Sequence, residues 1–171
     1  MHHNLSDVSV DSLARKAGLT RQTFYAIYGS TSEMLDDYLQ DTLDGMLVDF
    51  KASHIRPTDI DLEPRVARYL RDVFERLDRS DARLRTILAG EAALDTQARF
   101  VDLVDMMLSV DDSADVSETE RLTRVYFYSG AFVGTLRLWV FHPDEPDADE
   151  IAAAFARLIA RGCRPADGAL A

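Results

Sequence analysis

The chain has 171 residues, of which 47% are hydrophobic, and its 30 Asp and Glu against 19 Lys and Arg give a formal net charge of -11. This composition is that of a folded globular protein and excludes an intrinsically disordered chain. The single cysteine, Cys163, excludes an intramolecular disulfide framework, and the acidic total argues against indiscriminate attraction to nucleic acid or anionic lipid.

We expect a cytoplasmic protein with no membrane partner. The first residues lack the charged-then-apolar pattern of a secretory signal. No apolar run reaches the roughly 20 residues that a membrane-spanning helix needs. The longest run, 125–141, is interrupted by Ser129, Thr135 and Arg137, and we interpret it as a buried helix.

Two short helices are predicted at the start of the chain. The first has an apolar stripe at helical spacing, made of Val10, Leu13, Ala14 and Ala17. Gly18 ends this helix. The second is expected over 21–28, with Thr20 as its N-cap and Gly29 as its end.

A long helix is predicted next. Ser30 and Glu33 have the spacing of a capping box, in which the serine caps the helix and the glutamate reaches back to the backbone. The apolar stripe that follows consists of Leu35, Tyr38, Leu39, Thr42, Leu43, Met46, Leu47 and Phe50. It fades near His54, and Pro57 then marks a boundary. We therefore predict two domains, 1–54 and 55–171.

The second domain is predicted to be an antiparallel helix bundle. Apolar spacing predicts helices over 62–77, 84–90, 100–108 and 151–162. A second capping box, Ser117 with Glu120, opens a further helix that runs to Phe141. No alternating strand pattern is present, so the predicted fold class is all-α: a helix-turn-helix module followed by the bundle.

The segment from Val10 to Ser30 has the pattern of a helix-turn-helix motif, because a glycine-containing turn joins two short helices. The first turn of the second helix is polar and suits base edges and phosphates in a major groove. The candidate DNA-contacting residues are Ser9, Thr20, Arg21, Gln22, Thr23, Tyr25, Tyr28 and Thr31. The alternative is a plain helical hairpin whose polar side chains are merely solvated.

On these residues the sequence resembles the TetR-type bacterial transcriptional regulators. The resemblance rests on 14–25, Ala-Arg-Lys-Ala-Gly-Leu-Thr-Arg-Gln-Thr-Phe-Tyr, followed by Tyr28, Gly29-Ser30 and Glu33-Met-Leu. It implies a homodimeric repressor that binds palindromic operator DNA, with half-sites about 34–36 Å apart. It also implies that a small apolar or aromatic effector binds in the second domain, shifts the helices that begin near Met34 and Leu62, and releases the DNA.

Departures from the family pattern bear on DNA binding. Family members normally carry a further helix where only 1–9 stand here, so we expect either that the helix-turn-helix module is less firmly braced or that the sequence is a shortened form of a longer product. Thr31 stands in place of the usual lysine and Ile27 in place of the usual histidine. Residues 1–35 hold three cations and three acids and are neutral. These features favour an alternative function, a regulator-derived ligand-sensing or protein-interaction module that has lost DNA binding.

The resemblance places an effector pocket and a dimer interface in the second domain. The candidate ligand-binding residues are Phe74, Phe100, Met107, Tyr126, Tyr128 and Trp139. Each of these is also a normal core residue. The candidate dimer-interface residues are Gly130, Gly134, Phe155 and Ile159. For the two glycines, close packing within the subunit is an equal alternative.

We expect neither an enzyme nor a cofactor or metal site. The sequence has no glycine-flanked serine and no glycine-rich phosphate loop. His54 and His142 have no carboxylate at metal-ligand spacing. The acidic run that begins at Asp111 lacks the glycine and the closing glutamate of a calcium loop, and we interpret it as a solvated turn.

Overall fold

The structure is a computed structural model, and it describes residues 20, 22–23, 27–56, 59–92, 94–109, 117–142, 144 and 146–162. Over these ranges every regular element is an α-helix, which confirms the all-α class. The helices are α3 (Thr31–Ser53), α4 (Leu62–Arg76), α5 (Ala82–Ala89), α6 (Thr96–Leu108), α7 (Glu118–Phe141) and α8 (Ala148–Gly162). None of these helices is long and apolar enough to cross a bilayer. The helix predicted from Val10 to Ala17 lies outside the described residues.

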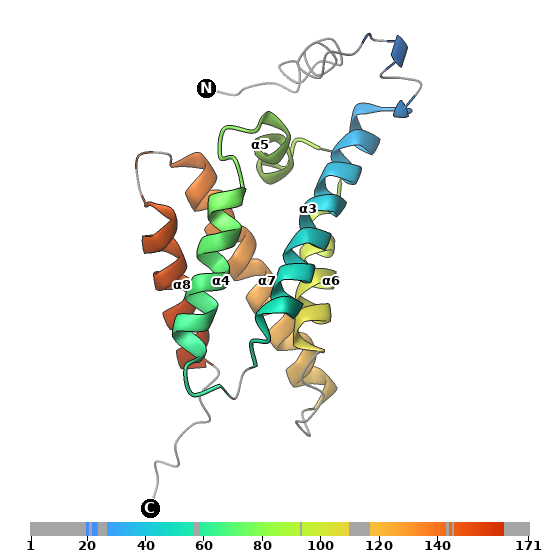
Figure 1. Ribbon diagram of the computed structural model, residues 1–171. Coiled ribbons are helices and arrows are strands. Elements are labelled where there is room, and N and C mark those ends of the chain that lie inside the picture. Colours follow the sequence, from blue (N-terminus) through green and yellow to red (C-terminus); the bar gives the residue numbers. More distant parts are fainter. Residues whose placement is uncertain are drawn as a thin grey trace, which may run out of the picture.

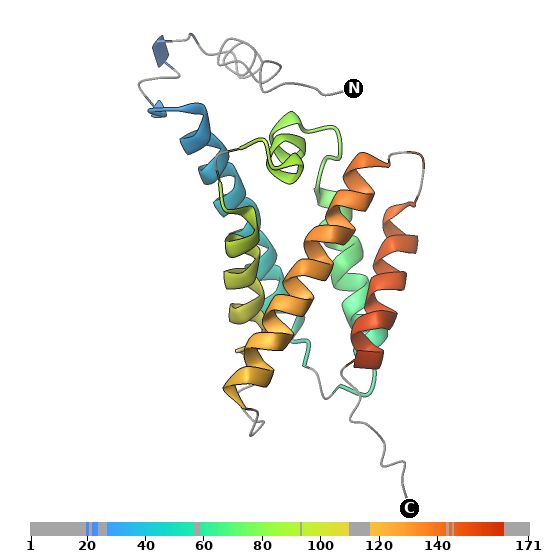
Figure 2. The same ribbon diagram turned by 180° about the vertical axis from the view of Figure 1, so that it is seen from behind.

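The helices form two pairs that α7 joins. α4 packs mainly on α8, and α3 packs on α6, while α7 crosses between the pairs and contacts α6 most closely. Short helix α5 lies at the end of the molecule where α3 begins (Figure 1). The view from behind shows α7 running the length of the bundle (Figure 2). The resulting core is continuous from α3 to α8.

The helix ends follow the predicted caps. Ser30 Oγ accepts a hydrogen bond from Glu33 N at 3.1 Å, and the Glu33 carboxylate accepts one from Gly29 N at 2.7 Å. The α3 helix ends at His54, which is left-handed with φ of 51°. Gly90 ends α5 with φ of 76°, as expected for a C-cap glycine. The predicted start and end of α3 and the predicted end of α5 at Gly90 are thereby confirmed, whereas α5 begins at Ala82, two residues before the predicted start.

The second predicted capping box is only half formed. Ser117 Oγ accepts from Glu120 N at 3.2 Å, but the Glu120 carboxylate pairs with Arg124 one turn later. A reciprocal box that the sequence reasoning missed opens α8 instead. There, Asp147 accepts from Glu150 N at 2.8 Å and Glu150 accepts from Asp147 N at 3.3 Å.

The expectation that 125–141 is a buried helix is wrong for one of its faces. Val125 and Leu136 are fully buried, but Tyr126 is 60% exposed, Phe127 68% and Leu138 45%. The reason is that apolar residues occupy both sides of α7, so only one side can face the core. The other side is an apolar surface that the described residues leave uncovered.

Arginines fasten α5 and its preceding loop to the end of α7. Arg85 Nη1 donates to Val140 O at 2.8 Å, and Arg137 donates to Leu88 O in the opposite direction. Arg79 donates to Pro146 O at 3.2 Å and lies over the Trp139 ring. Since the last carbonyls of a helix lack partners within it, these contacts satisfy groups that would otherwise be orphaned.

Candidate nucleic-acid interface and apolar cavity

The first turn of the second short helix is capped as predicted. Thr20 Oγ1 accepts a hydrogen bond from Thr23 N at 3.1 Å and lies 2.8 Å from Thr23 Oγ1. Thr20, Gln22 and Thr23 are all exposed. The cap confirms Thr20 as the start of this helix and brings three of the candidate DNA-contacting residues into one exposed polar turn.

The other candidate DNA-contacting residues lie apart from that turn or are not described. Tyr28 is half-buried and packs against the core, and Thr31 is half-buried at the first position of α3. Ile27, by contrast, is 57% exposed, so Tyr28 is the inward residue of this pair. Ser9, Arg21 and Tyr25 lie outside the described residues.

A cavity of about 130 Å³ lies between the helix pairs. Its lining consists of Phe50, Ile55, Leu62, Val66, Tyr69, Leu70, Val104, Met107, Leu108, Tyr128, Phe132, Phe155 and Ile159. The only side-chain oxygens among these residues are the hydroxyls of Tyr69 and Tyr128. Tyr69 donates its proton to Met46 O at 3.0 Å, and burial raises the pKa of this phenol. With no charged side chain in the lining, the cavity suits an apolar molecule.

Among the candidate ligand residues, Met107 and Tyr128 line the cavity. Phe74, Phe100 and Trp139 lie in the core, outside the lining, and Tyr126 is on the exposed side of α7. Phe74 packs on Trp139 with ring centroids 5.4 Å apart, so both rings are already occupied by core contacts.

Sequence reasoning missed most of the lining. The missed residues are Phe50, Ile55, Leu62, Val66, Tyr69, Leu70, Val104, Leu108, Phe132, Phe155 and Ile159. The signal that was available is the apolar stripe of α4, which contributes four of these residues. Periodicity identifies a buried face, but it does not tell a filled interface from one that leaves space.

The candidate dimer residues separate into two groups. Phe155 and Ile159 line the cavity, and the Phe155 ring stacks on Phe132 with ring centroids 6.1 Å apart. Gly130 and Gly134 are exposed, and a Cβ added to either would meet nothing within 4 Å. Within the part of the chain that the structure describes, these glycines are therefore not packed closely against another helix.

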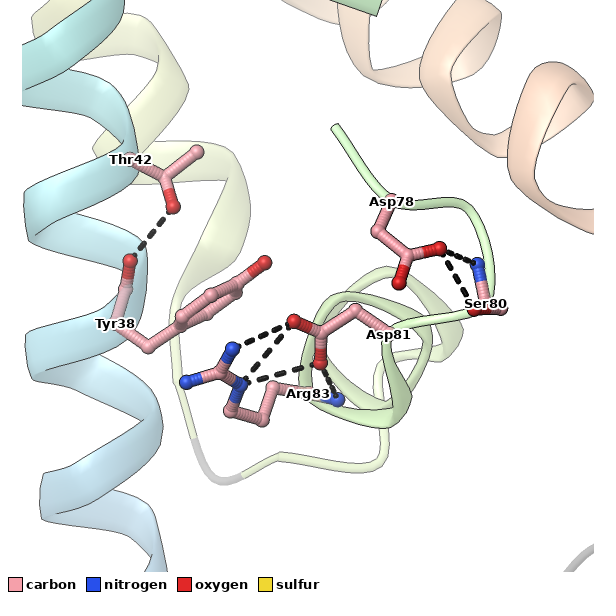
Figure 3. Close-up of polar contacts among 6 residues, drawn as sticks. All are labelled: Tyr38, Thr42, Asp78, Ser80, Asp81 and Arg83. Carbon is pink, nitrogen blue, oxygen red and sulfur yellow. Dashed lines mark hydrogen bonds and ion pairs between the residues drawn. The ribbon is translucent and has the colours of Figure 1, made fainter. Parts of the chain in front are cut away.

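A polar cluster that the sequence analysis did not identify joins α5 to α3 (Figure 3). The Asp81 carboxylate caps α5 by accepting from Arg83 N at 2.8 Å, and its Oδ2 pairs with Arg83 Nη2 at 2.7 Å. Burial opposes ionisation of Asp81, but the hydrogen bonds from Arg83 outweigh it and lower the pKa of the carboxyl. Burial, together with the negative charge of Asp81, raises the pKa of Tyr38 to about 12. The only sequence signal was the short Asp81 to Arg83 spacing.

No family model matches the sequence, and no curated protein matches it. Among solved structures, the chain is similar to the crystal structure of the TetR family transcriptional regulator PfmR from Thermus thermophilus. The similarity covers 94% of this chain and 91% of that one, with 21% sequence identity and a TM-score of 0.43.

Proposed function

We propose that this protein is a transcriptional regulator, and specifically a repressor, that binds operator DNA and is released by a small apolar effector. The observation that carries the proposal is the exposed polar turn capped by Thr20, with Gln22 and Thr23 beside it. A helix N-terminus with hydroxyl and amide side chains suits phosphates and base edges. The cavity between the helix pairs supplies the effector site.

The exposed side of α7 supports dimerisation. Tyr126, Phe127 and Leu138 expose large apolar side chains there, and Gly130 and Gly134 between them leave room for close approach. Exposed apolar patches of this kind mark interaction sites. A second copy of the same chain fits best, because a twofold axis places the glycines of one α7 against those of the other.

The experiment that tests this function is the selection of sheared genomic DNA by the purified protein at low and physiological salt. We expect a discrete palindromic fragment, with affinity that falls as salt rises. The double substitution Arg21→Ala with Tyr25→Phe removes a cation and a phosphate-reaching hydroxyl from the second short helix, predicted over 21–28. It is expected to abolish selection while the melting temperature and the dimer are unchanged.

A matched control is Lys51→Ala, which removes an exposed cation from the last turn of α3. This variant is expected to select the same fragment as the unaltered protein. Selection of the fragment by the double variant at full affinity contradicts the proposal. A folded dimer that recovers no DNA favours the second candidate, a ligand-sensing or interaction module, which the neutral charge of residues 1–35 supports.

A further inference from the structure

A charged groove shares part of its wall with the apolar cavity. Ile55 and Tyr69 line both, and α4 supplies the groove with Arg65, Arg68 and Arg76. Arg68 is the residue before Tyr69 in the chain. The groove that carries these arginines therefore adjoins the cavity at Ile55 and Tyr69.

Most of the charges in the groove are already neutralised. Arg76 contacts the Asp49 carboxylate, and Asp72 accepts from Arg71 at 3.2 Å. Arg65 pairs with Asp59 at 2.8 Å and also donates to Ser53 O and His54 O, both at 2.8 Å. These pairs account for both acids of the groove and for two of its three arginines.

Arg68 is the remaining cation. It is exposed, and it has no hydrogen bond or ion pair within the described ranges 27–56, 59–92, 94–109, 117–142 and 146–162. Its planar guanidinium matches a carboxylate with two parallel hydrogen bonds. Arg68 lines the groove and not the cavity, and the two adjoin at Ile55 and Tyr69, so a ligand that occupies both would carry its charge at one end only.

We propose that the cavity ligand is an anionic amphiphile, an alkyl chain with a carboxylate head, whose chain fills the cavity and whose head pairs with Arg68. This inference rests on the proposed ligand-responsive function and names the ligand class. Cavities near 150 Å³ take up a benzene-sized molecule, so one of about 130 Å³ holds a ring or about six carbons of a chain.

The test compares octanoate with 1-octanol, which have the same chain length and differ in head charge. Both are titrated into the full chain and followed by NMR. We expect Arg68→Gln to weaken octanoate binding about fivefold and to leave octanol binding unchanged. Added salt is expected to weaken octanoate binding alone. Arg157→Gln is the matched control, because it removes an exposed arginine from α8 that lines neither the cavity nor the groove.

Blocking the cavity tests binding of the ligand's alkyl chain independently of its carboxylate head. Met107→Trp fills it from α6, and Ile159→Phe fills it from α8 if the first variant is unfolded; either is expected to remove binding of both probes. Octanoate binding that is insensitive to Arg68→Gln overturns the proposal, as does failure of octanoate to bind. These binding measurements contain no DNA. If binding does not depend on the charge of the head group, the proposed ligand class is wrong, while the proposed regulator function is tested separately by the DNA selection experiment.

Discussion

The guanidinium carbon of Arg83 lies 4.1 Å from the centre of the Tyr38 ring, and this contact joins α5 to the first half of α3 (Figure 3). The same guanidinium pairs with the Asp81 carboxylate, and this ion pair holds it against the ring. The cluster is therefore one of the polar contacts that join α3 to the rest of the bundle.

Substitution Arg83→Ala is expected to lower the free energy of unfolding by about 1–2 kcal/mol, because the cation–ring contact and the Asp81 pair are lost together. Urea unfolding followed by circular dichroism measures this. Tyr38→Phe keeps the ring under the guanidinium and is expected to cost less than about 0.5 kcal/mol. Equal losses in the two variants would show that the ring contact contributes nothing.

Alkaline pH is expected to destabilise the protein through Tyr38. Its folded-state pKa of about 12 lies above the unfolded value near 10, so the protonated phenol favours the folded state. This stability is fully present below pH 10 and is lost as the pH rises toward 12. Urea midpoints between pH 9 and about 12 should fall less steeply in Tyr38→Phe than in the unaltered chain. The exposed Tyr126 provides the control, since Tyr126→Phe should retain the full loss.

Substitution of Gly29, just before α3, and of Gly45, inside α3, by alanine should change stability in opposite directions. A Cβ at Gly29 would lie 2.8 Å from Glu33 Oε2, so Gly29→Ala displaces the carboxylate from its bond to Gly29 N. We expect a loss of about 0.5–1.5 kcal/mol. Gly45 lies inside α3, where an added Cβ would meet nothing within 4 Å, and Gly45→Ala should gain about 0.5–1 kcal/mol. Thermal unfolding of both variants decides whether the Glu33 contact stabilises the start of α3.

The exposed side of α7 is expected to control oligomeric state. Phe127→Glu introduces a charge at the most exposed aromatic residue of this helix and should convert the dimer to a folded monomer. Sedimentation velocity measures the change. Val48→Glu, at a residue of α3 that is 65% exposed, is the control and should remain dimeric. A dimer that survives Phe127→Glu would place the interface elsewhere.

The helices could be predicted from the sequence more closely than the site. Ser30 and Gly90 fix helix ends through local hydrogen bonds or backbone conformation, and such signals are contained within a few residues. The directions in which Phe155 and Phe127 point cannot be predicted from such local signals. Apolar residues lie on more than one side of α7 and α8, so the choice of inward face depends on contacts with distant helices.

The same reasoning explains why the cavity was located only in part. Tyr128 was identified because a buried hydroxyl needs a partner, and this argument applies to one residue at a time. The remaining walls come from helices far apart in the chain, and their spacing is set by how α4 meets α8. Likewise, nothing local to Arg68 indicates that its neighbour Tyr69 borders a cavity.

The pairing of α4 with α8 also sets the order in which the protein can be completed during synthesis. The apolar face of α4 packs mainly on α8, and Phe155 and Ile159 close the cavity from that last helix. A nascent chain that has not yet reached Phe155 therefore presents Val66 and Leu70 to solvent or to a chaperone. The helix-turn-helix module and α3 leave the ribosome well before that point, so the segment proposed to contact DNA is made before the protein has a cavity in which to bind an effector.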